Sequence, residues 1–420
     1  MNQNKPSKQI FSYSWVIIGI SFLMIFANYG FCSSNRGLYL TAITEALDMK
    51  RSVFSISDTC RYAATSLVSI FFGSLLERFG TRKLLTAGYV CLIGFAVCYA
   101  LGTNIFIFCL GSALLGIGVA WTTTTMVGSI INKWCTKNKG TIMGVVLSAN
   151  GLGGAVAAQI ITPLIFQEGN PFGYRNAYWL VAGILLVIGL AAILLYKDNP
   201  VPITAPAEKK KKRGTSWSGP DIQQLKKKTY YYGTVLTMFL TGLGLTISSG
   251  TSTAYFQDIG MDPAVVASIL SVSSLALTGS KFLAGFLYDR LGLKITVTIC
   301  NIAAILASLA LWITTDTPVG IILAFAYAIV SAVSLPMQTI MLPILANDMF
   351  GNRSGDRLSG LLTSACTAGF AIGGPLINFV YDRVGTYKPT FPICAILMFI
   401  VTVVLLCMIR TAEKERSHYE

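Results

Sequence analysis

The chain alternates long apolar stretches with short polar ones along its whole length. A helix needs about 20 apolar residues to cross a bilayer, and twelve stretches approach that length. Because backbone polar groups find no water partners in hydrocarbon, each stretch is expected to be helical. The predicted spans are 14–35, 53–76, 84–102, 105–132, 140–166, 176–196, 229–254, 264–288, 293–313, 318–345, 357–381 and 390–410. The pattern predicts an all-α membrane protein with twelve transmembrane helices.

Small residues within these spans predict close contacts between helices. Glycine, alanine and serine let two helix backbones approach each other in a membrane. Such residues cluster in two spans, at Gly151, Gly153 and Gly154 and again at Gly369, Gly373 and Gly374.

The composition excludes several classes of protein. Of the 420 residues, 54% are hydrophobic and only 12% are charged, against about 25% charged residues in a soluble domain. A disordered chain is excluded too, because disorder needs low hydrophobicity. The ten cysteines lie far apart, mostly in apolar runs, and lack the spacing of metal ligands. The single histidine is His418, and no common catalytic or nucleotide-binding motif occurs. We therefore expect neither an enzyme nor a metal or other cofactor.

The positive charges predict the orientation of the protein in the membrane. With twelve spans both termini share one side, which carries 24 of the 32 lysines and arginines, against 6 on the other side and two within spans. Basic residues favour the cytoplasmic side, so both termini are expected to be cytoplasmic, in the inner membrane of the cell. The formal net charge of +14 is then mainly a topology signal, and nucleic acid is not an expected partner.

One long polar segment divides the chain. Residues 197–228 form a basic linker, with one cluster at 209–213 and another at 226–228. These clusters are typical of a cytoplasmic linker and would also attract anionic lipids. The predicted domains are a six-helix bundle at 1–196, the linker, and a second six-helix bundle at 229–420.

The two halves share a loop motif. Residues 73–83 read GSLLERFGTRK, and residues 285–294 read GFLYDRLGLK, with each matched position 212 residues apart. Internal duplication of a six-helix unit is typical of transporters. We expect the first glycine of each copy to allow close helix contact and the second to permit a tight turn.

This loop resembles that of the major facilitator superfamily, G-x-L-x-D-R-x-G-x-R-[RK], from which the first copy departs only by a glutamate. The resemblance implies a monomer of two pseudo-symmetric six-helix bundles that moves a solute by alternating access. It also implies that the loops act as a conformational latch in the outward-facing state. The residues concerned are Gly73, Glu77, Arg78, Gly80 and Arg82, with Gly285, Asp289, Arg290 and Lys294 as the counterpart.

A narrower resemblance concerns three short segments. Tyr13-Ser14-Trp15, the stretch from Trp134 through Lys139-Gly140 to Gly144, and the stretch from Gly374-Pro375 to Phe391 are similar to the monocarboxylate transporters and oxalate/formate antiporters. This resemblance implies a small organic anion as substrate.

Charged residues within spans are candidates for substrate binding, because each costs about 2.5–3.5 kcal/mol at mid-membrane on insertion scales. Lys281 lies eight residues before Asp289, or about 12 Å from the cytoplasmic edge and near the middle of the membrane. Arg61 is expected close to the outer interface, where Asp58, three residues earlier, would pair with it. Arg36 is also expected near the outer surface.

The resemblance implies roles for several of these positions. Its members carry a basic residue, usually arginine, at the place of Lys281, where it binds the substrate carboxylate. The second basic residue of the oxalate transporter falls at Cys366, and the lysine of the monocarboxylate transporters falls at Ser33. Arg36 is one helical turn from Ser33 and is a candidate substitute. One central cation favours a monoanion over a dianion.

Uncharged polar residues within spans are secondary candidates: Asn28, Asn150, Gln338 and the threonines Thr122 to Thr125. A buried amide needs partners, whereas threonines in a membrane helix often bond only to their own backbone. Proton-coupled members of this group carry a carboxylate four residues before the basic residue at the place of Lys281, and that position is Leu277 here. Proton symport, with Lys281 carrying the proton, and anion exchange both remain open.

The sequence as a whole predicts a secondary transporter of a small organic monocarboxylate. Efflux or uptake of a larger amphiphilic acid or drug, resembling a bile acid, is the alternative. A sensor without transport is a more remote one.

Overall fold

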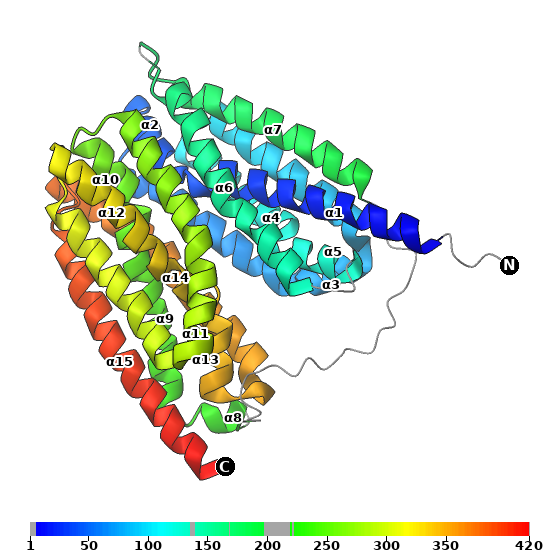
Figure 1. The fold of residues 1–420 in the computed structure, drawn as a ribbon. Coiled ribbons are helices and arrows are strands. Elements are labelled where there is room, and N and C mark those ends of the chain that lie inside the picture. Colours follow the sequence, from blue (N-terminus) through cyan, green and yellow to red (C-terminus); the bar gives the residue numbers. More distant parts are fainter. Residues whose placement is uncertain (1–5, 135–138, 168, 197–218, 221, 420) are drawn as a thin grey trace. The chain divides into compact units, whose positions relative to one another are not determined.

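The computed structural model describes the chain except for residues 1–5, 135–138, 168, 197–218, 221 and 420 (Figure 1). The basic cluster at 209–213 therefore lies outside the described residues. Within the described part, every regular element is a helix. This agrees with the expectation that apolar segments of this length satisfy their backbone hydrogen bonds internally.

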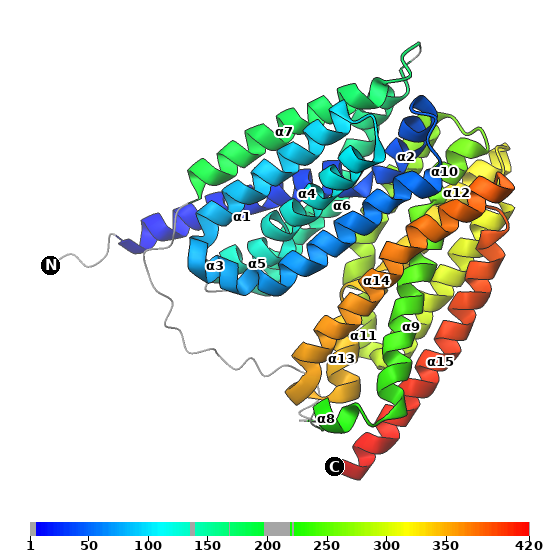
Figure 2. The ribbon, with the colours of Figure 1, turned by 180° about the vertical axis from the view of Figure 1, so that it is seen from behind.

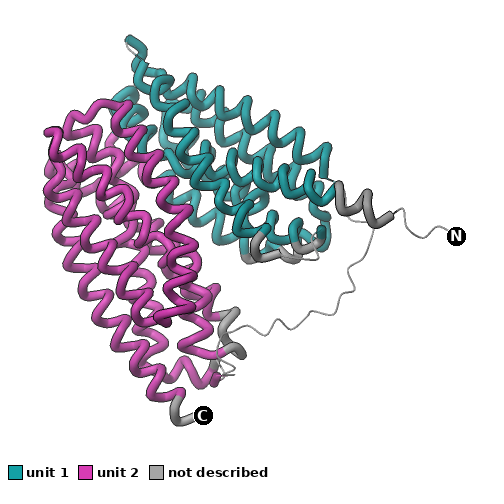
Figure 3. Tube along the Cα trace, in the orientation of Figure 1, with its two compact units in different colours: residues 1–49, 56–205 teal, residues 50–55, 206–420 magenta. Residues whose placement is uncertain are grey.

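The chain divides into two compact units, shown in Figure 3. Unit 1 comprises residues 1–49 and 56–205, and unit 2 comprises residues 50–55 and 206–420. Residues 50–55, the start of a long helix of unit 1, are thus grouped with unit 2, which the sequence did not indicate.

Unit 1 contains seven α-helices and one π-helical turn among its described residues. They are α1 (Pro6–Tyr29), the π-helix η1 (Gly30–Ser34), α2 (Arg36–Ala46), α3 (Arg51–Leu101), α4 (Ile105–Thr122), α5 (Thr124–Trp134), α6 (Lys139–Ile165) and α7 (Gly173–Leu195). The ends of the predicted spans of the first half lie within these helices or one residue beyond them, and Thr123 interrupts the span 105–132.

Unit 2 repeats this order of elements. Its described elements are α8 (Ile222–Leu225), α9 (Thr229–Leu245), the π-helix η2 (Thr246–Gly250), α10 (Ser252–Asp258), α11 (Pro263–Ile313), α12 (Pro318–Ser334), the 3-10 helix η3 (Leu335–Gln338), α13 (Met341–Phe350), α14 (Asn352–Val384) and α15 (Thr390–Tyr419). Helix α9 lies between α14 and α15, as Figures 1 and 2 both show.

Ten helices within the described residues are long and apolar enough to cross a membrane. The difference from twelve has two causes. Helix α11 contains two predicted spans, 264–288 and 293–313, that continue through one turn. In α3, the predicted span 53–76 includes positions 70, 73 and 74, whose side chains lie outside the described set. The structure is thus the all-helical membrane protein that the sequence predicts.

The second glycine of each loop motif adopts the same unusual backbone conformation. Gly80 has φ 76° and ψ 164° within α3, and Gly292 has φ 79° and ψ 177° within α11. Side chains with a Cβ rarely adopt positive φ, so only glycine allows these bends without strain. The tight turns predicted for both loops are therefore confirmed.

Two further interruptions recur at equivalent places in the two units. The π-helical turns begin at Gly30 and, 216 residues later, at Thr246. Thr123 separates α4 from α5. Thr339, again 216 residues later, follows η3 at the break between α12 and α13. The duplication seen in one loop motif therefore extends to the breaks within the helices.

Close helix contacts occur where the glycine pattern predicts them. A Cβ on Gly153 of α6 would lie 2.1 Å from the Phe26 carbonyl oxygen of α1, and one on Gly369 of α14 would lie 2.1 Å from the Phe239 carbonyl oxygen of α9. The prediction for Gly285 is wrong, because a Cβ there would meet nothing within 4 Å. The surroundings of Gly73 lie outside the described residues.

These contacts lead to a pair of matched substitutions in unit 2. Gly369→Ala should destabilise the protein by about 1–3 kcal/mol, because the added methyl group meets the α9 backbone. Gly285→Ala should be neutral or stabilise by up to about 1 kcal/mol, because alanine favours the helix and has space. Thermal unfolding in detergent measures both effects, and equal melting temperatures for the two variants would contradict the packing described.

Candidate functional site

The helix interruptions expose polar groups that a continuous helix would hide. At the π-helical turn of unit 1, Asn35 Nδ2 donates to the carbonyl oxygens of Gly30 and Gly154, each at 3.1 Å. At the equivalent turn of unit 2, the Tyr327 hydroxyl donates to the Ser248 carbonyl oxygen at 2.6 Å. Side chains thus satisfy the carbonyl oxygens of Gly30 and Ser248, which lie in the two π-helical turns. Broken helices at matching positions of two repeats mark the binding region of many transporters.

Five hydroxyl and amide groups gather at the breaks of unit 1. Tyr29, the last residue of α1, has its hydroxyl 3.3 Å from the side-chain oxygens of both Thr123 and Thr124. Ser34 Oγ donates to the Tyr29 carbonyl oxygen at 3.1 Å and to Asn150 Oδ1 at 3.4 Å. Ser34 and Thr124 are exposed, and Tyr29 and Asn150 are half-buried. This cluster offers hydrogen bonds to a solute. The sequence named Asn150, Thr123 and Thr124 as secondary candidates but did not identify Tyr29 or Ser34.

Asn28, next to Tyr29 in α1, does not belong to this cluster. It is fully buried, and its Nδ2 donates to the Tyr89 hydroxyl at 3.3 Å and to the Thr122 carbonyl oxygen at 3.5 Å. The second bond satisfies the backbone where α4 ends. Asn28 therefore supports the helix break, and we remove it from the candidate substrate ligands.

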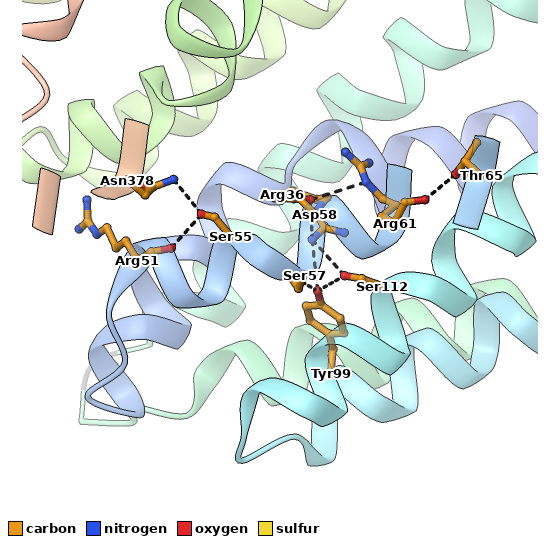
Figure 4. Close-up of polar contacts among 10 residues, drawn as sticks. All are labelled: Arg36, Arg51, Ser55, Ser57, Asp58, Arg61, Thr65, Tyr99, Ser112 and Asn378. Carbon is orange, nitrogen blue, oxygen red and sulfur yellow. Dashed lines mark hydrogen bonds and ion pairs between the residues drawn. The ribbon is translucent and has the colours of Figure 1, made fainter. Parts of the chain in front are cut away.

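A group of charged side chains lies near the start of α3 in unit 1 (Figure 4). Arg36 Nη2 is 2.8 Å from Asp58 Oδ1, and Arg61 Nε is 3.6 Å from the same oxygen. The pairing of Arg61 with Asp58 was predicted from their spacing, whereas the pairing of Arg36 with Asp58 was not. We call these three residues the Arg36–Asp58–Arg61 cluster.

Neighbouring groups position both arginines of the cluster. Arg36 Nη2 donates to the Tyr99 hydroxyl at 3.2 Å, and the Tyr99 hydroxyl lies 2.6 Å from Ser112 Oγ. Gly116 of α4 packs on α3, where a Cβ would lie 2.4 Å from the Arg61 carbonyl oxygen. The Arg61 guanidinium lies over the Tyr62 ring, 4.4 Å from its centre.

Lys281 lies within the first part of α11, eleven residues before the Gly292 turn, or about 16 Å along the helix. Its side chain is half-buried, and no described residue forms a hydrogen bond or ion pair with it. Three half-buried residues at helical spacing share its face of α11: Ser271, Ser274 and Thr278. An ammonium group thus ends a polar stripe inside a membrane span.

An apolar stripe runs beside this polar one. Leu275, Phe282 and Phe286 are each roughly half-exposed and follow the same helical spacing. Helix α11 therefore presents both a polar face ending at Lys281 and an apolar, aromatic face next to it.

The remaining candidates of unit 2 lie in different surroundings. Cys366 is 2% exposed and packs in the apolar core with Met238 and Leu362. We remove it from the candidate ligands, because a solute would not reach it. Gln338 ends η3, is half-buried, and forms no hydrogen bond with the described residues.

A buried ion pair explains why residues 50–55 group with unit 2. Arg51 donates two hydrogen bonds of 2.6 Å to the Asp258 carboxylate and lies 4.1 Å from the centre of the Tyr381 ring. The Asp382 carboxylate accepts from the backbone N–H groups of Arg51 and Ser52 at 3.2 and 3.1 Å, which caps the start of α3. Arg51 lies outside the predicted span 53–76, and its local sequence does not indicate this ion pair.

The charged residues of the two loop motifs are largely exposed. Among the described residues, Glu77, Arg78, Asp289 and Arg290 form no ion pair. Lys294 instead pairs with Glu413 of α15. The turn conformation at Gly80 and Gly292 is thus observed, and the latch remains a proposal.

Asp348, near the end of α13, is a half-buried acid outside the candidate membrane spans. The Tyr288 hydroxyl donates to its Oδ2 at 2.8 Å. Burial raises the pKa of Asp348, which the Tyr288 hydrogen bond and the charge of Arg416 partly offset. The ionised carboxylate therefore carries an unfavourable desolvation free energy in the folded state.

Comparison with known proteins places these features in a family. The sequence pattern of the Major Facilitator Superfamily matches residues 20–240 and 234–419. A crystal structure of the nucleoside transporter NupG superposes with a TM-score of 0.75 at 17% identity, covering 94% of this chain and 98% of that one. That likeness concerns the fold.

Three curated relatives are similar at low identity. MFS-type transporter 1 of Ophiocordyceps sp. (strain BCC 1869) is 23% identical over 71% of this chain, which spans only 64% of that protein. Monocarboxylate transporter 13 of Bos taurus is 22% identical over 90% of this chain and 85% of its own length. Multidrug resistance protein 2 of Bacillus subtilis (strain 168) is 23% identical over 76% of this chain and 78% of its own length. Their names span several kinds of substrate.

The raised pKa of Asp348 gives a pH-dependent prediction. Asp348→Asn should raise the melting temperature at neutral pH, because the amide keeps an acceptor for Tyr288 and carries no desolvated charge. The pKa of Asp348 is higher in the folded protein than in the unfolded chain, where it is 3.8. The wild type therefore gains stability as the pH falls from the folded-state pKa towards the unfolded-state value. The advantage of the variant should therefore shrink in acid. Thermal unfolding across this range tests the effect, with the exposed Asp316→Asn as control; a constant difference would refute it.

Proposed function

We propose that this secondary transporter, which belongs to the Major Facilitator Superfamily, carries a small organic monocarboxylate across the cytoplasmic membrane by alternating access. The chain is a multi-pass membrane protein and not an enzyme. The proposal adds the substrate class to that family assignment. Transport would proceed either as proton symport or as exchange of one anion for another.

The observation that carries the proposal is the unpaired ammonium group of Lys281. A charge within a membrane span is costly, and no carboxylate among the described residues compensates this one. A carboxylate substrate would supply the missing counter-ion, and the hydroxyl groups of Ser274 and Thr278 lie on the same helix face to bind its other polar atoms. The similarity to monocarboxylate transporter 13 supports the same substrate class.

The chemistry of lysine further narrows the substrate. Its ammonium group is a compact point charge without the planar fork of arginine. One such charge balances one carboxylate, which favours a monoanion. Within unit 1, the Tyr29, Ser34 and Asn150 cluster offers hydrogen bonds to a polar solute. Gln338 is a further candidate ligand in unit 2.

A second candidate function is transport of a larger amphiphilic acid or drug. The exposed Phe282 and Phe286 beside Lys281 would accommodate an apolar or aromatic tail. The similarity to multidrug resistance protein 2 supports this alternative. A transport-competition panel of short acids, bile acids and cationic dyes separates the two candidates, since only the second predicts that the larger compounds compete.

For the transport cycle, we propose that the loops at Gly80 and Gly292 latch the outward-facing state. Their exposed Glu77, Arg78 and Asp289 would then pair with groups that become available in that state. Both termini and these loops would be cytoplasmic, as the distribution of basic residues indicates.

The proposed role of Lys281 leads to a direct transport experiment. Lys281→Gln should reduce uptake of a short monocarboxylate into proteoliposomes by about a hundredfold, since truncating one partner of a buried charge pair costs about 3 kcal/mol. Lys281→Arg should retain uptake to within about tenfold, because it keeps the positive charge. The exposed Lys388→Gln controls for the general loss of a basic residue. Undiminished uptake by folded Lys281→Gln protein would exclude the assignment.

A further inference from the structure

The Arg36–Asp58–Arg61 cluster of unit 1 holds two cations and one anion. Among the described residues, Asp58 is the only carboxylate within ion-pair distance of either guanidinium. The side chains of Arg36 and Arg61 are 14% and 16% exposed, so solvent screens the excess charge only partly. The cluster therefore carries one uncompensated positive charge in largely buried surroundings, where a charge normally has a partner.

The hydrogen bonds of the cluster are also incomplete. Three buried polar atoms of the cluster have no hydrogen-bond partner among the residues that the structure describes: Arg36 Nη1, Arg61 Nε and Asp58 Oδ1. Both arginines approach the same Asp58 oxygen, yet neither guanidinium completes a well-directed hydrogen bond to it. Buried polar atoms without partners are rare in proteins and call for an explanation. One carboxylate oxygen shared by two arginines leaves donors of both arginines unused.

We propose that unit 1 contains its own carboxylate-binding site, in which a monocarboxylate binds to Arg61 and Arg36 in competition with Asp58. The incoming carboxylate accepts hydrogen bonds from Arg61 Nε and Arg36 Nη1 and brings the net charge of the cluster to zero. Asp58, with 31% of its side chain exposed, is the most accessible member of the three and marks where the ligand enters. The site rests on the proposed function in one respect, namely that its ligand belongs to the substrate class of Lys281.

Electroneutrality decides which ligands the site accepts. One carboxylate balances the excess charge, whereas a dicarboxylate would leave a buried negative charge. Tyr99 and Ser112 hold Arg36 in place whether or not a ligand is bound. Two arginines balance two negative charges, and the Asp58 carboxylate supplies one of them. Asp58 therefore determines specificity, because it leaves room for a ligand with only one negative charge.

The test measures binding by titration calorimetry in the full-length protein with Lys281→Gln, which removes the other candidate cation. Propionate and malonate serve as probes, because they have the same number of carbon atoms and differ by one carboxylate. Propionate should bind to this protein, and malonate should bind more weakly. Failure of propionate to bind would overturn the site in unit 1, while the transport assay of Lys281→Gln decides the proposed function separately.

Two further substitutions move the affinity in opposite directions. Arg61→Gln leaves the Arg36–Asp58 pair neutral, so the protein should be at least as stable without ligand, and its affinity for propionate should fall at least about tenfold. Asp58→Asn removes the competing charge, so the affinity for propionate should rise about tenfold and malonate should bind more tightly as well. A merely structural ion pair predicts no change of affinity in either variant.

The outcomes are distinct even if one variant fails to fold. Unchanged affinity in Arg61→Gln, which is the variant expected to be stable, would overturn the proposal by itself. Weaker propionate binding in folded Asp58→Asn protein would do the same. A gain of malonate binding in Asp58→Asn together with loss of propionate binding in Arg61→Gln would establish the site.

Discussion

The hydrogen-bonding requirement of the backbone in hydrocarbon governs this structure. It makes every described regular element a helix, and it makes each break in a helix a feature that needs a compensating group. Asn35 and Tyr327 supply such groups at the two π-helical turns, and Asn28 does so where α4 ends. The breaks recur at matching positions of the two units, so the duplication preserves these interruptions along with the helices.

Charge within the membrane is the second constraint, and the two units meet it differently. Unit 2 places one ammonium group, that of Lys281, on a polar helix face without a described partner. Unit 1 gathers two guanidinium groups around Asp58, with Tyr99 and Ser112 positioning that of Arg36. In both cases a positive charge exceeds the acids available to it. That excess is the physical basis for proposing an anionic substrate.

Much of the candidate site was predictable where it depends on neighbours along one helix. The pairing of Arg61 with Asp58 follows from a spacing of three residues, and the isolation of Lys281 follows from the lack of acids nearby in α11. Residues brought from other helices were not predictable in this way. Arg36 reaches Asp58 across 22 positions of sequence, and Arg51 reaches Asp258 across 207. Nothing in the local sequence indicates either pairing.

The sequence alone determined the helical class, the duplicated loop and its two glycine turns, because these depend on hydrophobic length and backbone conformation at single positions. It also identified the charges that membrane burial makes costly. Only the tertiary structure decided which polar side chains stay partly exposed at the helix breaks and which support the backbone, separating Asn150 from Asn28 and removing Cys366. The physical reason is that the rotation of each helix about its axis is set by packing against its neighbours, and a residue's own sequence position does not encode that contact.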